Sequence, residues 1–200
     1  MGEAAVVRLI ERPTVWRQQV ERFLETKMSD SLSAGSSFSV AENLDTGKIE
    51  ALIFERAPFL CVDKAVILSQ GGVKTILTKS VVTKETCDGH FPGKMIIPLL
   101  VFSKIIALTG EILVAWVKKS DIVPLAIRAG EVKAVSTILV SPPTLVITKA
   151  QFIREKGPYC WVTANAWVGN EKVAQIKELV YFLMPTDQFF SSAQHGIQLG

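Results

Sequence analysis

The chain has 200 residues, of which 48% are hydrophobic and 20% are charged, a composition that suits one folded domain with an appendage. Its net charge is +3, from 22 basic and 19 acidic residues, and the basic residues form no clustered stripe of the kind that nucleic-acid binding requires. We therefore expect a protein with a sizeable apolar core that binds no nucleic acid.

The three cysteines, Cys61, Cys87 and Cys160, lie far apart, and the chain has only two histidines. Zinc sites and disulfide scaffolds usually show closely spaced cysteines in even numbers. We predict no metal and no cofactor, and we expect a reducing, cytoplasmic compartment. Charged residues at Glu3 and Arg8 come too early for the apolar segment of a secretory signal.

The N-terminal part of the chain predicts an appendage. Residues 14–28 carry apolar side chains at helical spacing, and residues 29–37 are rich in serine and glycine. We therefore assign residues 1–47 to a helical extension and linker.

From Lys48 onward the pattern becomes that of strands and one helix. Residues 59–68 and 73–82 are apolar, β-branched runs joined by a short turn, and a loop at 83–95 precedes a long apolar stretch at 96–117. Four further strand-like runs follow, at 125–140, 144–154, 159–168 and 171–184. This order predicts an α+β fold in which one helix packs on a mostly antiparallel sheet, spanning 48–185. Residues 186–200 are expected to be a flexible tail.

The apolar stretch 96–117 is long enough to suggest a membrane span. Lys104 stands near its middle, where a charge costs roughly 2.5 to 3.5 kcal/mol on insertion. A helix that is apolar nearly all round can also be the buried centre of a soluble fold. We therefore predict a buried helix and no membrane span.

A short motif precedes this helix: Gly89-His90-Phe91-Pro92-Gly93, followed by Ile97-Pro98. Together with residues 56–63 (RAPFLCVD) and the helix itself, it resembles the 3-hydroxyacyl-[acyl-carrier-protein] dehydratases of fatty-acid and polyketide synthesis. The resemblance covers about residues 48–185. It implies a hotdog fold, in which an antiparallel sheet wraps around one long central helix.

The resemblance also implies site residues. In the family a histidine removes the α-proton of the acyl thioester, and His90 matches this base. Backbone amides at the helix start bind the thioester carbonyl, because the helix N-terminus favours developing negative charge. By the same resemblance the substrate contacts Phe59, Phe91, Gly93, Pro98 and Leu99, and Leu99 stands where the family usually has glycine.

Lys104 departs from the family pattern. It stands fourteen residues after His90, where the family has Glu or Asp as the acid for the departing hydroxyl. A lysine can donate a proton or stabilise an enolate, but an ammonium is a much weaker acid than a carboxyl group. Alternatively, its stem follows the helix and its amine reaches a carboxylate or solvent. Glu111 lies ~10.5 Å along the helix axis from Lys104, which is too far for an ordinary ion pair within one helix. A carboxylate from a second subunit is therefore an equal alternative as the partner of the Lys104 amine.

Other side chains near the motif remain open as alternatives. Cys87 is a candidate nucleophile, and Glu85 and Asp88 are candidate substitute acids. We predict a homodimer or higher even oligomer that processes acyl thioesters carried by acyl carrier protein or coenzyme A, as a dehydratase-like lyase with altered acid chemistry. Thioester hydrolysis, double-bond isomerisation, or acyl binding without catalysis on the same scaffold are the alternatives.

Overall fold

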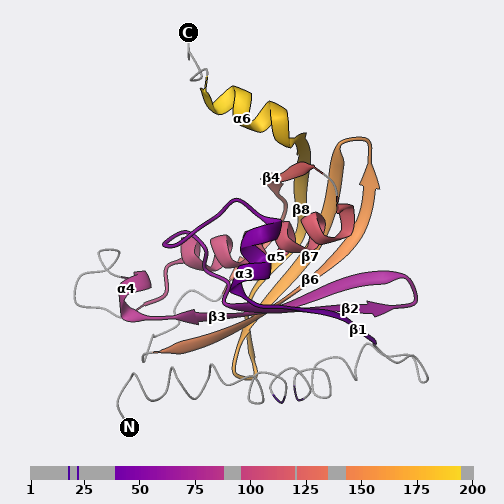
Figure 1. Cartoon of the computed structure of the whole chain (residues 1–200). Coiled ribbons are helices and arrows are strands. Elements are labelled where there is room, and N and C mark those ends of the chain that lie inside the picture. Colours follow the sequence, from indigo (N-terminus) through magenta and orange to yellow (C-terminus); the bar gives the residue numbers. More distant parts are fainter. Residues whose placement is uncertain are drawn as a thin grey trace.

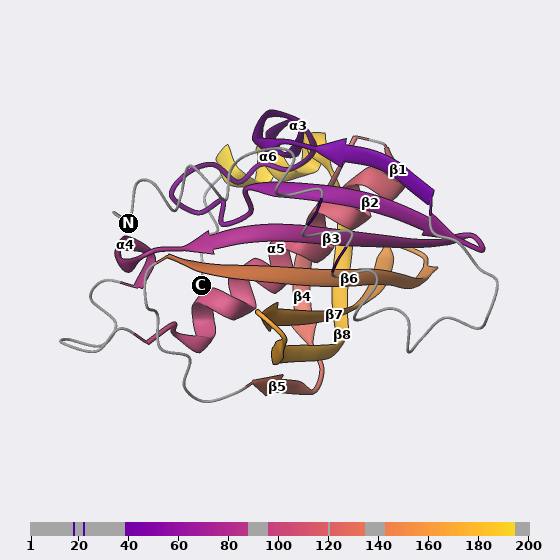
Figure 2. The same ribbon diagram turned by 90° about the horizontal axis from the view of Figure 1, so that it is seen from below.

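The computed structural model describes residues 18, 22, 39–87, 96–119, 121–134 and 143–194. In these ranges the chain forms an antiparallel sheet with the strand order β1-β2-β3-β6-β7-β8-β4, and β5 pairs with β8 (Figure 2). The strands are β1 Ser39–Leu44, β2 Lys64–Gln70, β3 Val73–Val82, β4 Ile122–Ala129, β5 Val132–Ala134, β6 Thr144–Lys156, β7 Tyr159–Val168 and β8 Glu171–Pro185. The helices are α3 Thr46–Leu52, α4 Lys84–Cys87, α5 Leu99–Lys118 and α6 Thr186–Gln194. The predicted α+β architecture with one long central helix is confirmed.

The central helix α5 lies along one face of the sheet and contacts β3, β4, β6, β7 and β8 (Figure 1). It is long and apolar enough to cross a membrane, but 67% of its most apolar stretch is buried inside the fold. The prediction of a buried helix is therefore confirmed. Its apolar side chains, among them Phe102, Ile105 and Ile112, form the centre of the main hydrophobic core.

Small side chains on the sheet let the helix approach closely. In β7 every second residue is buried, as the alternating sequence predicts, and Ala164 and Ala166 stand among these buried positions. On the helix, Gly110 fits against β8, because a Cβ atom there would lie 2.3 Å from the hydroxyl oxygen of Tyr181. Helix and sheet therefore meet through complementary small and large residues.

The sheet begins earlier in the chain than we predicted. β1 pairs with β2 along Ser39–Leu44, and α3 follows directly. Asp45 caps α3 by accepting a hydrogen bond from the Lys48 backbone amide at 2.9 Å. The strand predicted at 59–68 begins only at Lys64, as β2, because residues 57–59 form a turn. The predicted N-terminal helix 14–28 lies outside the described residues except for Gln18 and Arg22, which are helical.

Two further differences lie after the central helix. The run predicted as one strand at 125–140 contains β4 and β5, separated at Gly130, and its last residues fall outside the described ranges. Residues 186–194, which the sequence assigned to a flexible tail, form the helix α6. Aromatic packing holds this helix, since Phe189 stacks on Phe54 at 5.6 Å between ring centroids and Phe190 meets the same ring edge-on at 5.1 Å.

Candidate functional site

A pocket of about 630 Å³ opens beside the N-terminal half of α5. Its walls come from the loop before β2, the end of β3, α4 and the first turns of α5. The lining residues are Pro58, Phe59, Leu60, Cys61, Asp63, Val81, Val82, Glu85, Thr86, Leu100, Val101, Lys104 and Ile105. The pocket thus brings together Phe59, Lys104 and Glu85, the last of which the sequence offered as a candidate substitute acid.

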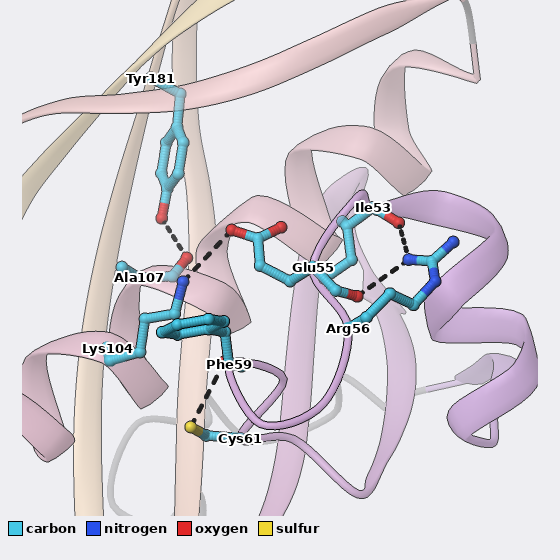
Figure 3. A network of polar contacts seen from close by, with 8 residues as sticks. All are labelled: Ile53, Glu55, Arg56, Phe59, Cys61, Lys104, Ala107 and Tyr181. Carbon is cyan, nitrogen blue, oxygen red and sulfur yellow. Dashed lines mark hydrogen bonds and ion pairs between the residues drawn. The ribbon is translucent and has the colours of Figure 1, made fainter.

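Lys104 forms an ion pair with a residue that sequence reasoning missed. Its Nζ lies 3.2 Å from Oε1 of Glu55, as Figure 3 shows. The side chains are 37% and 24% exposed, respectively, so the pair is partly shielded from water. The alternative in which the amine reaches a carboxylate agrees with this geometry, and a catalytic role for Lys104 stays a prediction.

Arg56 holds the loop that carries Glu55. Its guanidinium donates to the carbonyl oxygens of Ile53 and Glu55 at 2.8 and 2.9 Å, and to that of Glu50 at 2.9 Å. Three donors directed at three carbonyls fix the backbone just after α3. The Glu55 carboxylate is therefore presented to Lys104 from a braced loop, as Figure 3 shows for the first two bonds.

Glu111 lies next to this ion pair and is only 7% exposed. Burial raises the pKa of its carboxyl to about 9, with further upward contributions from the Glu55 charge and a hydrogen bond with Glu55, while the Lys104 charge lowers it. Glu55 thus contacts both Lys104 and Glu111. These three residues line a second pocket of about 370 Å³, whose other walls are β4, α5 and Phe189.

Tyr181 completes the polar environment from the sheet side. Its hydroxyl donates to the carbonyl oxygen of Ala107 at 2.6 Å (Figure 3). Burial, together with the neighbouring carboxyls of Glu111 and Glu55, holds the pKa of Tyr181 well above that of a free phenol. Tyr181 therefore remains a neutral hydrogen-bond donor at physiological pH.

Cys61 lines the first pocket, but its surroundings disfavour the reactive thiolate. Burial is the main cause that raises the pKa of this thiol; the Asp63 charge adds to the rise, and the Lys104 charge opposes it. The thiol also lies 3.4 Å from the carbonyl oxygen of Phe59, toward which it can donate. Since the thiolate is the nucleophile of cysteine, this residue is a wall of the pocket rather than an attacking group.

The start of α5 has the features that bind a carbonyl oxygen. Pro98 is buried at the N-cap position, and no side chain caps the helix there. Leu99 and Leu100 are 52% and 71% exposed, and Phe59 is 69% exposed. The first amides of the helix are therefore not covered by a capping side chain, although contact of Leu99 with substrate stays a prediction.

The remaining predicted residues are not described. His90, Phe91, Gly93 and Asp88 lie outside the described residues, and Cys87 is described only as the last residue of α4. The described chain on either side, at α4 and at the start of α5, supplies Thr86 and Leu100 to the first pocket.

Comparison with known proteins places this architecture in a family. No family model matches the chain. The 3-hydroxyacyl-[acyl-carrier-protein] dehydratase FabZ of Syntrophobacter fumaroxidans is 31% identical over 138 residues, which are 68% of this chain and 92% of the relative. The enzyme of the same name from Oceanobacillus iheyensis is 30% identical over 58% of this chain and 81% of the relative. That of Desulfotalea psychrophila is 27% identical over 78% and 99%.

Solved structures agree on the fold. A hot-dog-like protein from Thermanaerovibrio acidaminovorans superposes with a TM-score of 0.52 at 12% identity, over 63% of this chain and 90% of that chain. A thioesterase superfamily member from Thermus thermophilus gives 0.51 at 13% identity, over 60% and 87%. The sheet wrapped around α5 is a hotdog fold, and the chain belongs to the 3-hydroxyacyl-[acyl-carrier-protein] dehydratase family.

Proposed function

We propose that this protein processes acyl thioesters as a dehydratase-like lyase, acting on 3-hydroxyacyl groups carried by acyl carrier protein or coenzyme A. The single observation that carries the proposal is the pocket of about 630 Å³ that Lys104 and Phe59 both line; by the resemblance, Lys104 matches the family's acid. Family membership supports the substrate class, since the relatives are named for this reaction.

The chemistry of the pocket suits an acyl chain with one polar end. Most of its lining is apolar, with Phe59, Leu60, Val82, Val101 and Ile105 as the large side chains. Its volume lies in the range of ~300–1,000 Å³ that small-molecule sites usually have. The acyl chain would lie against these residues, with its 3-hydroxyl directed to Lys104.

Lys104 would supply the proton that the family takes from a carboxylic acid. Its ammonium points into the site while Glu55 holds it at 3.2 Å. In this proposal His90 removes the α-proton, Lys104 protonates the departing hydroxyl, and the amides at the start of α5 hold the thioester oxygen. The altered acid chemistry is therefore a lysine fixed by a carboxylate.

The ion pair itself favours a second candidate. If the ion pair with Glu55 does not open during the reaction, Lys104 closes the site without donating a proton, and the protein binds acyl thioesters without turning them over. Hydrolysis or isomerisation on the same scaffold has no separate observation in its favour.

We further propose that two copies associate through the exposed apolar rim of the pocket. This rim consists of Phe59 and Leu100, which line the pocket, and of Leu99, the chain neighbour of Leu100; each is more than half exposed in the single chain. Exposed apolar patches of this kind commonly mark protein contacts.

Mass spectrometry tests the function directly. The protein is incubated with 3-hydroxyacyl and 2-enoyl thioesters of several chain lengths, on both acyl carrier protein and coenzyme A. We expect interconversion of the two species with gain or loss of water, and its loss in Lys104→Met. Binding without conversion would support the second candidate, and release of free acid would indicate a hydrolase.

A further inference from the structure

On the side of Lys104 that faces the second pocket, polar side chains come from three parts of the described chain. Glu55 reaches in from the loop after α3, Lys104 and Glu111 come from α5, and the Tyr181 hydroxyl approaches from β8. β4 adds only Val123, Pro124, Leu125 and Ala126 to this pocket, and α6 adds Phe189. Among the described residues lining the second pocket, Lys104 is thus the sole cation facing two carboxyl groups.

Two carboxyl groups in hydrogen-bond contact need one proton between them. An ionised carboxylate only accepts hydrogen bonds, so a bond between Glu55 and Glu111 requires one of them to be protonated. Glu111 is the better position for that proton, because its side chain is nearly inaccessible to water and lies among apolar residues. Glu55 is more exposed, and its carboxyl group faces the Lys104 amine at 3.2 Å.

We infer that Glu55 and Glu111 hold one shared proton and form a reserve acid behind Lys104. This inference rests on the proposed function in one respect, the step that uses the proton. In that step the N–H bond of the Lys104 ammonium breaks and an O–H bond forms on the departing hydroxyl, which leaves as water. The neutral amine then takes a proton from the carboxyl pair through Glu55, and Glu111 gives its proton to Glu55. The pair, left with both groups ionised, regains a proton from solvent between turnovers.

The arrangement explains how a lysine can stand in an acid's position. Lys104 lines both pockets, so a substrate in the first pocket covers one side of its amine while Glu55 and Glu111 remain on the other. Proton transfer is most effective when the donor's pKa is close to the working pH. The pKa of about 9 for Glu111 brings a carboxyl group nearer to the range of amines than a solvated carboxyl group would be.

Infrared spectroscopy tests the shared proton without requiring turnover. We expect wild-type protein at neutral pH to show the carbonyl stretch of a protonated carboxyl group, which disappears as the pH rises through about 9. Glu111→Gln should lose this band. Glu85→Gln is the matched control, since Glu85 is an exposed carboxylate in the first pocket, and it should keep the band. A wild type without the band, or an unchanged band in Glu111→Gln, overturns the inference.

Kinetics tests the use of the proton. We expect Glu111→Gln to lower kcat by ~10²-fold with little change in KM, and to alter the alkaline limb of the kcat–pH profile, because it removes a positioned proton source. Since glutamine has the size of the protonated acid and does not titrate, a melting temperature near neutral pH that is no lower than that of wild type separates this effect from misfolding. Equal kcat in wild type and variant overturns the relay. If the wild type shows the band but converts no thioester, the proposed function fails and the relay with it, whereas the proton pair stands.

Discussion

At the scale of single residues, the site depends on how charge is distributed around Lys104. Lys104 lies 3.2 Å from Glu55, and Glu111 lies close enough to be influenced by both charges. Exchanging any one of these three side chains therefore changes the electrostatic surroundings of the other two. Predictions for this site have to treat the three side chains as a unit.

Glu111→Gln should change how stability depends on pH. The pKa of Glu111 is raised in the folded state, so folding binds a proton between its ordinary value and about 9. Its contribution is present at low pH and is lost as the pH rises through about 9, with a slope of up to ~1.4 kcal/mol per pH unit. Urea unfolding of wild type at about pH 6 and about pH 9 should show this fall, and Glu111→Gln should show less of it. If the free energy of unfolding changes equally with pH in the two proteins, the pKa of the Glu111 carboxyl is not raised by folding.

We expect Lys104→Glu alone to give slow dehydration, and Lys104→Glu combined with Glu55→Gln to give faster dehydration. Alone it places a third carboxyl group beside Glu55 and Glu111, where carboxylates repel one another and no cation remains among the described residues of the second pocket. Combined with Glu55→Gln it restores a carboxyl acid at the family position with a neutral neighbour. We expect the double variant to dehydrate a 3-hydroxyacyl thioester ~10²–10⁴-fold faster than the single one, measured by enoyl product formation. Equal rates would show that Glu55 has no influence on the acid.

At the scale of elements, the fit between α5 and β8 holds the site in place. The Tyr181 hydroxyl bonds to the Ala107 carbonyl within α5, and Gly110 leaves room for that hydroxyl. A substitution at this contact should therefore affect the position of α5, the helix that carries both Lys104 and Glu111.

Gly110→Ala should destabilise the protein, although alanine is the better helix former by about 1 kcal/mol. The added methyl would lie 2.3 Å from the Tyr181 hydroxyl oxygen and 3.0 Å from its ring carbon, so the ring has to move. Overpacking of this kind costs ~1–3 kcal/mol. In the Tyr181→Phe background the same substitution should cost less, which denaturant unfolding of the four proteins measures. An equal cost in both backgrounds would mean that the tyrosine hydroxyl does not set the limit.

At the scale of the whole molecule, the apolar rim of the first pocket bears on assembly. Phe59, Leu99 and Leu100 are exposed around the pocket mouth, although their size and apolarity favour burial. Contact with a second copy would cover them.

We predict a dimer in solution, which light scattering at micromolar concentration would detect. Leu100→Asp should shift the protein toward monomer, because it places a charge in the contact. Val40→Asp is the matched control, since Val40 is similarly exposed but lies on the edge strand β1, away from the pocket. A monomeric wild type, or equal effects of both substitutions, would contradict this assignment of the interface.

The sequence alone predicted the parts of the fold that rest on long apolar runs. β3 and the central helix follow from such runs, and β7 follows from alternation. β1, α3 and α6 were missed because they are short or polar, and because aromatic contacts between distant segments stabilise α6. The Glu55–Lys104 pair joins residues 49 positions apart, so no local pattern indicates it. His90 was found by resemblance, and its placement lies outside the described residues.

Because Lys104 stands in the walls of both pockets, its side chain acts as a partition between two compartments of about 630 and 370 Å³. The salt bridge to Glu55 holds the Lys104 amine between the two pockets. A ligand that drew the amine away from Glu55 would open a route from the mouth toward β4 and Phe189. The same lysine would then set how long a chain the protein accepts, by the energy needed to displace it.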